Sequence, residues 1–111
     1  DRAAAADPND ASALISAAQL AIRANRLGIA EQKIQAAAKR APNALLLRQT
    51  QAMLLFERNQ YDKALVTLQD ILRAEPRFVP AIVLAAMTHL QRGEPNQAET
   101  LLRPVAQQRL G

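Results

Sequence analysis

The chain of 111 residues contains no cysteine and no tryptophan, and only 3% of its residues are aromatic. The lack of cysteine excludes disulfide bonds, thiolate metal sites and cysteine nucleophiles. A core with so few aromatic rings has to be built from Ala, Leu, Ile and Val, and such small side chains suit close packing of helix on helix. No apolar run approaches the ~20 residues that a membrane-spanning helix needs.

Motifs for catalysis are also missing. The sequence has no phosphate-binding loop, no glycine-rich fingerprint and no Ser/His/Asp ordering. Its single histidine, His89, falls in one helical packing column with Ala21 and Leu55. A lone histidine there is more often structural than a ligand, and a metal site needs several converging ligands. The sequence therefore predicts neither an enzyme nor a bound metal or other cofactor.

The formal net charge of +4 is carried mostly by arginine. A basic balance can attract acidic partners or nucleic acid. Here the basic residues are scattered along the chain and interleaved with acids, without a block of like charge. This pattern favours a solvated helical surface over a nucleic-acid interface.

The most informative feature that is present is a repeat with a step of 34 residues. A period near this length is typical of stacked helical hairpins, because one hairpin cannot bury its apolar face alone. Asparagine or glycine recurs where each hairpin is expected to bend, and proline follows the second helix of the first two repeats, at Pro42 and Pro76. The recurring sets are Ala18, Ala52 and Ala86; Ala30, Ala64 and Ala98; Ile34, Leu68 and Leu102; Pro8, Pro42 and Pro76; and Asn25, Asn59 and Gly93.

Apolar residues at i, i+3, i+4 and i+7 spacing predict two helices in each repeat. We expect helices at roughly 11–24, 28–40, 44–57, 61–74, 79–91 and 96–109. Asp10 and Asn43 are candidate N-caps. Pro80 and Pro95 lie near helix starts, where a missing N–H costs nothing. Pro104 falls inside the last helix and is expected to kink or weaken it.

These recurring positions resemble the signature of the tetratricopeptide repeat family, with a small residue in the first helix, alanine plus a large apolar residue in the second, and a closing proline. The segment 59–65, NQYDKAL, is especially typical. The resemblance implies an all-α fold, a right-handed superhelical solenoid of three antiparallel helix hairpins. It would form a single domain over 1–111, with repeats at about 9–42, 43–76 and 77–110.

The sequence departs from the family pattern in two respects. The bulky position of the first helix is Leu14 and Ile82 in the outer repeats but Arg48 in the middle one. No polar capping helix follows the third repeat, although the end of a solenoid normally needs one. We therefore expect the chain to be part of a longer one, or to meet a partner beyond its last repeat.

The resemblance also implies a function, which is to bind a partner in a concave groove lined by the first helices. Many of the positions that the family uses for ligands are apolar here, and exposed apolar surface often marks an interaction site. We expect an apolar groove that takes a protein, a peptide or an amphipathic helix. Ordinary packing between helices is the competing interpretation for the same residues. The expected groove residues are Ile15, Gln19, Ile22, Gln49, Met53, Phe56, Val83, Met87 and Leu90.

One known binding mode of the family is disfavoured. A carboxylate clamp for acidic C-terminal peptides uses Lys, Asn and Arg on this wall, and none of the corresponding positions is positively charged. A heat-shock co-chaperone of that type is therefore not expected. Those positions are Ile15, Gln19, Gln49, Met53, Val83 and Met87.

Two other functions remain open on sequence grounds. The apolar wall could mediate self-association into a homo-oligomer. An RNA-binding helical repeat is less favoured, because such repeats use a 35-residue step and base-reading positions.

The sequence is also loosely similar to bacterial repeat proteins of the cell envelope. The similarity lies in the segments 78–81 and 101–105 and in the excess of Arg over Lys. On that resemblance, a role in a bacterial multiprotein assembly is expected, with the periplasm or envelope favoured over the cytoplasm.

Overall fold

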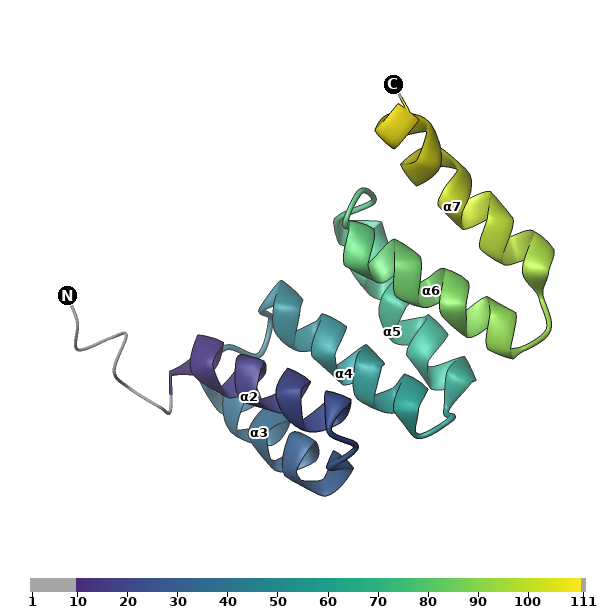
Figure 1. Ribbon diagram of the computed structural model, residues 1–111. Helices are drawn as coiled ribbons and strands as arrows, with labels where there is room; N and C mark the ends of the chain where they lie inside the picture. The colour runs from purple at the N-terminus through teal and green to yellow at the C-terminus, as the bar shows by residue number, and fades with distance from the viewer. Residues whose placement is uncertain (1–9, 111) are drawn as a thin grey trace. The chain divides into compact units, whose positions relative to one another are not determined.

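A computed structural model describes residues 10–110, with the side chains of residues 10–107. Within this range the chain forms six α-helices and no strand (Figure 1). The predicted all-α hairpin fold is confirmed, and each helix begins and ends within one residue of its predicted bounds. Pro8, the first member of the proline column, lies outside the described residues. The helices are α2 (Ala11–Arg23), α3 (Leu27–Arg40), α4 (Leu45–Glu57), α5 (Tyr61–Ala74), α6 (Val79–Gln91) and α7 (Pro95–Leu110).

The helices divide between two compact units, and the boundary lies inside α4. The N-terminal unit ends at Leu54 and the C-terminal unit begins at Leu55. The 34-residue repeat therefore does not coincide with this division. A single domain with a right-handed superhelical course over the whole chain stays a prediction.

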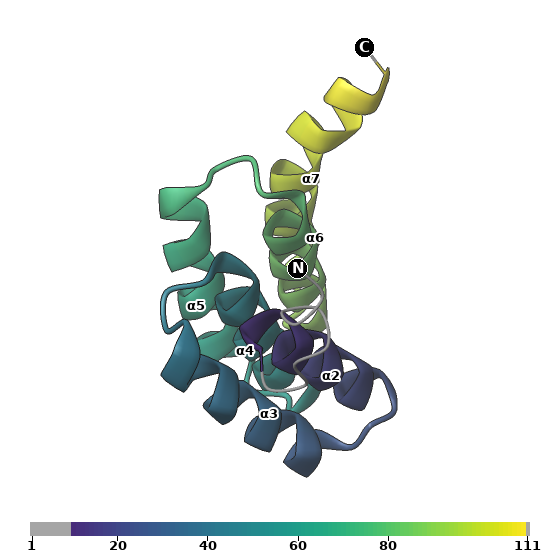
Figure 2. The same cartoon turned by 90° about the vertical axis from the view of Figure 1, so that its left-hand side faces the viewer.

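In the N-terminal unit, α2 and α3 pack side by side as a hairpin, as both views show (Figure 1, Figure 2). In the same unit, a hydrogen bond joins polar side chains of α2 and α4. Gln19 Nε2 donates to Thr50 Oγ1 at 3.1 Å, while Thr50 Oγ1 donates to the Leu46 carbonyl at 2.7 Å. This arrangement satisfies the fully buried hydroxyl of Thr50. The core cluster consists of Leu14, Ile15, Ala18, Ala21, Ile22, Ala30, Ile34, Ala37, Leu47 and Leu54.

In the C-terminal unit, α6 packs against both α5 and α7. Thr88 is fully buried and donates to the Leu84 carbonyl at 2.7 Å, so this core hydroxyl is also satisfied. Apolar residues of all three helices form the interior. They are Ala64, Leu65, Leu68, Ile71, Ala81, Ile82, Leu84, Ala85, Ala86 and Ala98.

The alanine columns mark places where helices approach closely. Ala18, Ala52 and Ala86 are at most 1% exposed, and Ala30, Ala64 and Ala98 are at most 2% exposed. Any larger side chain at these positions would have to displace a neighbouring helix, since protein interiors are close-packed. The recurrence of alanine is therefore a packing requirement.

Three hairpin bends share one backbone conformation. Asn25, Asn59 and Gly93 have φ of 60°, 62° and 75°, in the left-handed region that Gly and Asn tolerate best. Each bend carries the two hydrogen bonds of a Schellman motif. At the first, the N–H of Arg26 donates to Ala21 O at 2.7 Å and that of Asn25 to Ile22 O at 3.0 Å.

The same pair of bonds recurs at the other two bends. Gln60 N–H donates to Leu55 O, and Glu94 N–H to His89 O, each at 2.9 Å. The bonds satisfy carbonyl groups that a helix end would otherwise leave without partners. The prediction that these three positions form the bends is confirmed.

The observed positions of the prolines and N-caps agree with the predicted ones, with one exception. Pro42 and Pro76 follow the C-cap residues of α3 and α5, Ala41 and Glu75, as predicted. Asp10 occupies the N-cap position of α2, but its side chain makes no capping hydrogen bond. The prediction that Asn43 is an N-cap is wrong, because α4 begins only at Leu45.

Pro104 lies inside α7, and the helix continues through it. A proline at this position has no N–H to donate to the carbonyl four residues earlier.

Candidate functional site

The nine predicted groove residues divide between the two units. In the N-terminal unit, Ile15 and Ile22 are each 6% exposed and belong to the core cluster with Leu47 and Leu54. Their side chains pack inside the unit and present little surface to a ligand. The competing interpretation from the sequence, packing between helices, describes these two residues.

The other predicted residues of this unit are also engaged in the fold. Gln49 is 5% exposed. Gln19 donates its hydrogen bond to Thr50. Met53 is partly buried and packs against the core cluster. The polarizable thioether of methionine adapts to irregular spaces of this kind.

In the C-terminal unit, three of the predicted groove residues are exposed. Val83, Met87 and Leu90 are 38%, 44% and 53% exposed, although all three are large apolar side chains. Their spacing of four and three residues places them on one face of α6. We call these three residues the α6 stripe. The neighbouring positions Leu84, Ala85, Ala86 and Thr88 are buried, so the stripe lies on the side of α6 that faces away from the interior of the unit.

Phe56 differs from the stripe in being half-buried. Its ring meets that of Tyr61 edge-on, with centroids 5.5 Å apart and an interplanar angle of 62°. Edge-to-face packing of this kind is a favourable arrangement of two aromatic rings. Tyr61 Oη also lies 2.8 Å from Asn59 Oδ1, to which it donates a hydrogen bond. Phe56 therefore packs against a residue at the bend between α4 and α5.

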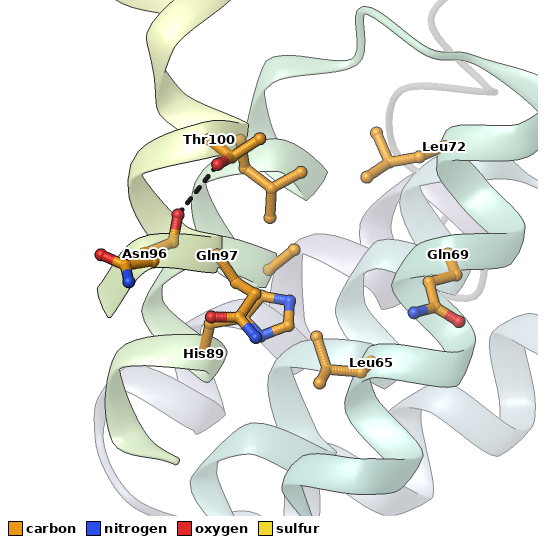
Figure 3. Close-up of a pocket in the computed structure, with 9 residues that line it drawn as sticks. Leu65, Gln69, Leu72, His89, Asn96, Gln97 and Thr100 are labelled. Atoms are coloured by element: carbon orange, nitrogen blue, oxygen red, sulfur yellow. Dashed lines mark hydrogen bonds between the residues drawn. The ribbon is translucent and has the colours of Figure 1, made fainter. Parts of the chain in front are cut away.

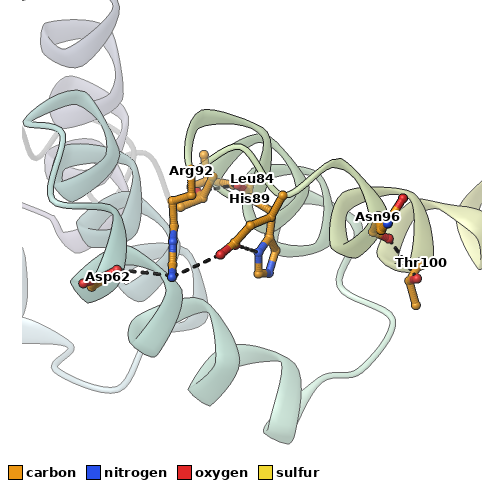
Figure 4. A network of polar contacts seen from close by, with 8 residues as sticks. Asp62, Leu84, His89, Arg92, Asn96 and Thr100 are labelled. Carbon is orange, nitrogen blue, oxygen red and sulfur yellow. Dashed lines mark hydrogen bonds and ion pairs between the residues drawn. The ribbon is translucent and has the colours of Figure 1, made fainter.

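A chain of polar contacts links the start of α5 to the bend after α6 (Figure 4). Arg92 Nη1 lies 3.2 Å from Asp62 Oδ1, and Arg92 Nη2 lies 3.2 Å from Glu94 Oε2. Glu94 Oε1 in turn lies 2.8 Å from His89 Nδ1. His89 therefore contacts a carboxylate across the bend.

The sequence did not reveal this network, although one signal was available. His89 and Glu94 are five residues apart with the left-handed Gly93 between them. A Schellman bend reverses the chain and brings the residue after it back to the end of the helix. A histidine and a carboxylate on the two sides of such a bend are therefore candidates for a hydrogen-bonded pair.

Residues 10–110 contain no group of three or more His, Cys, Asp or Glu side chains placed to hold a metal ion. None of the described helices is both long and apolar enough to cross a membrane.

The hairpins, their repeated bends and the buried alanine columns define a helical-hairpin repeat protein. A family model described as tetratricopeptide repeat matches residues 55–110, which is half of the chain. The chain belongs to the tetratricopeptide repeat family. Members of this family are, in general, non-enzymatic modules that mediate contacts between proteins. No curated protein and no solved structure matches the chain.

Proposed function

We propose that the chain is a scaffold that binds a partner protein through the α6 stripe, Val83, Met87 and Leu90. The single observation that carries the proposal is the exposure of these three apolar side chains, 38%, 44% and 53%, on one face of one helix. Contiguous exposed apolar surface is uncommon unless it serves an interaction. Members of the family generally bind other proteins, and we propose that this chain does so through the α6 stripe.

The chemistry of the stripe favours an apolar partner surface. None of its side chains carries a charge or a hydrogen-bond donor, and the thioether of Met87 is only a weak acceptor. A partner would therefore gain mainly from removing apolar area from water. An amphipathic helix fits this requirement, since its apolar residues recur at the same i, i+3, i+4 and i+7 spacing. Met87 in the middle can adapt its conformation to the partner.

Site-specific photo-crosslinking tests the proposal. A genetically encoded photo-reactive residue replaces Met87, and a matched control carries it at Val66, which is 59% exposed on α5. In lysate of cells that produce the chain, we expect one foreign protein to be linked from position 87 and not from position 66. In the position 87 variant, Val83→Lys with Leu90→Lys should abolish that adduct, while Leu20→Lys should not.

The alternative function is self-association through the same stripe. Crosslinks from position 87 only to further copies of the chain would favour it over a foreign partner. The sedimentation coefficient should then rise with protein concentration, and Met87→Lys should remove that rise. Equal adducts from positions 87 and 66 would contradict both functions.

The bacterial assembly and the envelope location are part of the same proposal and rest on the sequence resemblance alone. Cell fractionation tests them. Recovery of the chain with periplasmic or envelope markers supports the location, and recovery with cytoplasmic markers contradicts it.

A further inference from the structure

A second surface lies on the C-terminal unit, between α5 and α7, with α6 as its floor. It consists of two adjoining pockets of about 540 Å³ and 340 Å³, which share Leu72, Thr100 and Leu101 in their walls. We call this surface the α5–α7 groove. His89, Ala85 and Ile82 line it from α6, whereas none of the three residues of the α6 stripe does.

The two parts of the groove differ in chemistry. The larger pocket carries carboxamide side chains on both walls, Gln69 from α5 and Asn96 and Gln97 from α7, which Figure 3 shows on opposite sides. All three residues are exposed. Among the described residues their carboxamides make no hydrogen bond. The hydroxyl of Thr100 donates to the Asn96 carbonyl at 2.9 Å and keeps its lone pairs available.

The smaller pocket is mainly apolar and contains a single charge. Leu72, Ile82, Leu101 and Val105 line it together with Arg77. Arg77 has no ion pair among the described residues. No aspartate or glutamate lines either pocket. The groove therefore combines an apolar trough with one uncompensated cation at its end.

We propose that the α5–α7 groove binds an extended segment of another protein that has apolar side chains and an acidic residue at the Arg77 end. The extended form follows from the carboxamides. A helix satisfies its own main-chain groups, whereas an extended chain leaves N–H and C=O groups that need partners. Carboxamides both donate and accept, so Gln69, Asn96 and Gln97 can serve either group.

The acidic residue follows from charge complementarity. An arginine that faces an apolar pocket without a counter-ion favours a carboxylate, with which it forms a charge-assisted, bidentate pair. In an extended segment, alternate side chains point the same way. One set of apolar side chains would then lie on Leu72, Ile82 and Leu101, while the carboxylate reaches Arg77.

Fluorescence polarisation with defined peptide pools tests the proposal on the full chain. The probes are fluorescein-labelled decapeptides with Leu or Val at alternate positions, mixed polar residues between them, and Glu at either end. Matched pools carry Lys or Gln in place of Glu. We expect the better-oriented Glu pool to bind about 2- to 5-fold more tightly than its Lys counterpart, the range for an exposed ion pair.

Charge reversal makes the test specific. Arg77 is exposed, so Arg77→Glu should keep its helical circular dichroism while it reverses the preference, with Lys pools binding more tightly than Glu pools. Arg40→Glu, a reversal at an exposed residue at the end of α3, should leave the preference unchanged. Gln69→Ala should weaken all pools alike, because main-chain bonds do not depend on the end residue.

Three results would overturn the proposal. One is the absence of binding by every pool. Another is an unchanged Glu preference in Arg77→Glu. The third is loss of binding in Met87→Lys, which would place the peptides on the α6 stripe. Since the last variant separates the two surfaces, failure of the groove and failure of the stripe give different results.

Discussion

Asn59 and Gly93 occupy equivalent hairpin bends, one repeat step apart, with φ of 62° and 75°. An asparagine and a glycine thus serve the same backbone conformation. What the position requires is tolerance of positive φ, since no side-chain contact requires glycine there. A Cβ at Gly93 would meet no atom within 4 Å.

We expect Gly93→Ala to lower the free energy of unfolding by about 1–2 kcal/mol, the cost of a left-handed L-residue. Because the site is open, this loss would come from the backbone alone. Gly93→Asn should lose less, since asparagine already holds the equivalent bends. The measurement is urea unfolding followed by circular dichroism.

Gly28 provides the matched control for Gly93. It lies in the first turn of α3, and a Cβ there also meets no atom within 4 Å. Gly28→Ala should be neutral or stabilising by up to about 1 kcal/mol, because alanine is the better helix former. Equal losses at both glycines would show that the left-handed bend is not the cause.

Ala64 tests the packing of α5 against its neighbours. It is 0% exposed, so the extra atoms of leucine have no space. We expect Ala64→Leu to destabilise by about 1–3 kcal/mol, the usual cost of overpacking. Ala74→Leu, at the exposed end of the same helix, should change stability by less than about 0.5 kcal/mol. An unchanged melting temperature for Ala64→Leu would argue against close packing at this column.

The sequence predicted the helices and bends well because both depend on local, recurring signals. Alanine, asparagine and proline return at one fixed step. Asparagine and proline do so because of the local backbone conformation, and alanine because the same contact between helices recurs in each repeat. The repeat identifies equivalent positions, but it does not identify their neighbours. Ile15 and Val83 are equivalent by the repeat, yet one is 6% and the other 38% exposed. Burial depends on which helices surround each position, and that is a tertiary property.

The same limitation explains why two features of the C-terminal unit could not be predicted from the sequence. The pair of His89 and Glu94 depends on how a bend returns the chain, and the α5–α7 groove depends on residues from three helices. Gln69 and Asn96 are unremarkable polar residues in the sequence. They become candidate binding residues only because they lie on opposite walls of one pocket.

The polar contacts around the bend after α6 should contribute unequally to the stability of the fold. Asp62 has a side chain 89% exposed, whereas those of His89 and Glu94 are 17% and 27% exposed. Exposed ion pairs contribute little, since solvent screens them. We expect Asp62→Asn to cost less than about 0.5 kcal/mol and Glu94→Gln about 1 kcal/mol, because the latter affects two partners that are less exposed. Chemical unfolding of both variants measures the difference. A larger loss for Asp62→Asn would contradict this order.

Met53 and Met87 are equivalent by the repeat, and the groove hypothesis predicts that lysine at either one impairs binding without loss of helical structure. The structure separates them. Met53 packs against the core cluster of its unit, and Met87 is 44% exposed on α6. We therefore expect Met53→Lys to lower the free energy of unfolding by about 1–3 kcal/mol, since the charged end must leave the packed site. Met87→Lys should change it by less than about 0.5 kcal/mol, because lysine there remains in water. Urea unfolding measures both. Comparable losses would mean that Met87 is also buried in solution, and the α6 stripe would then no longer be an exposed surface.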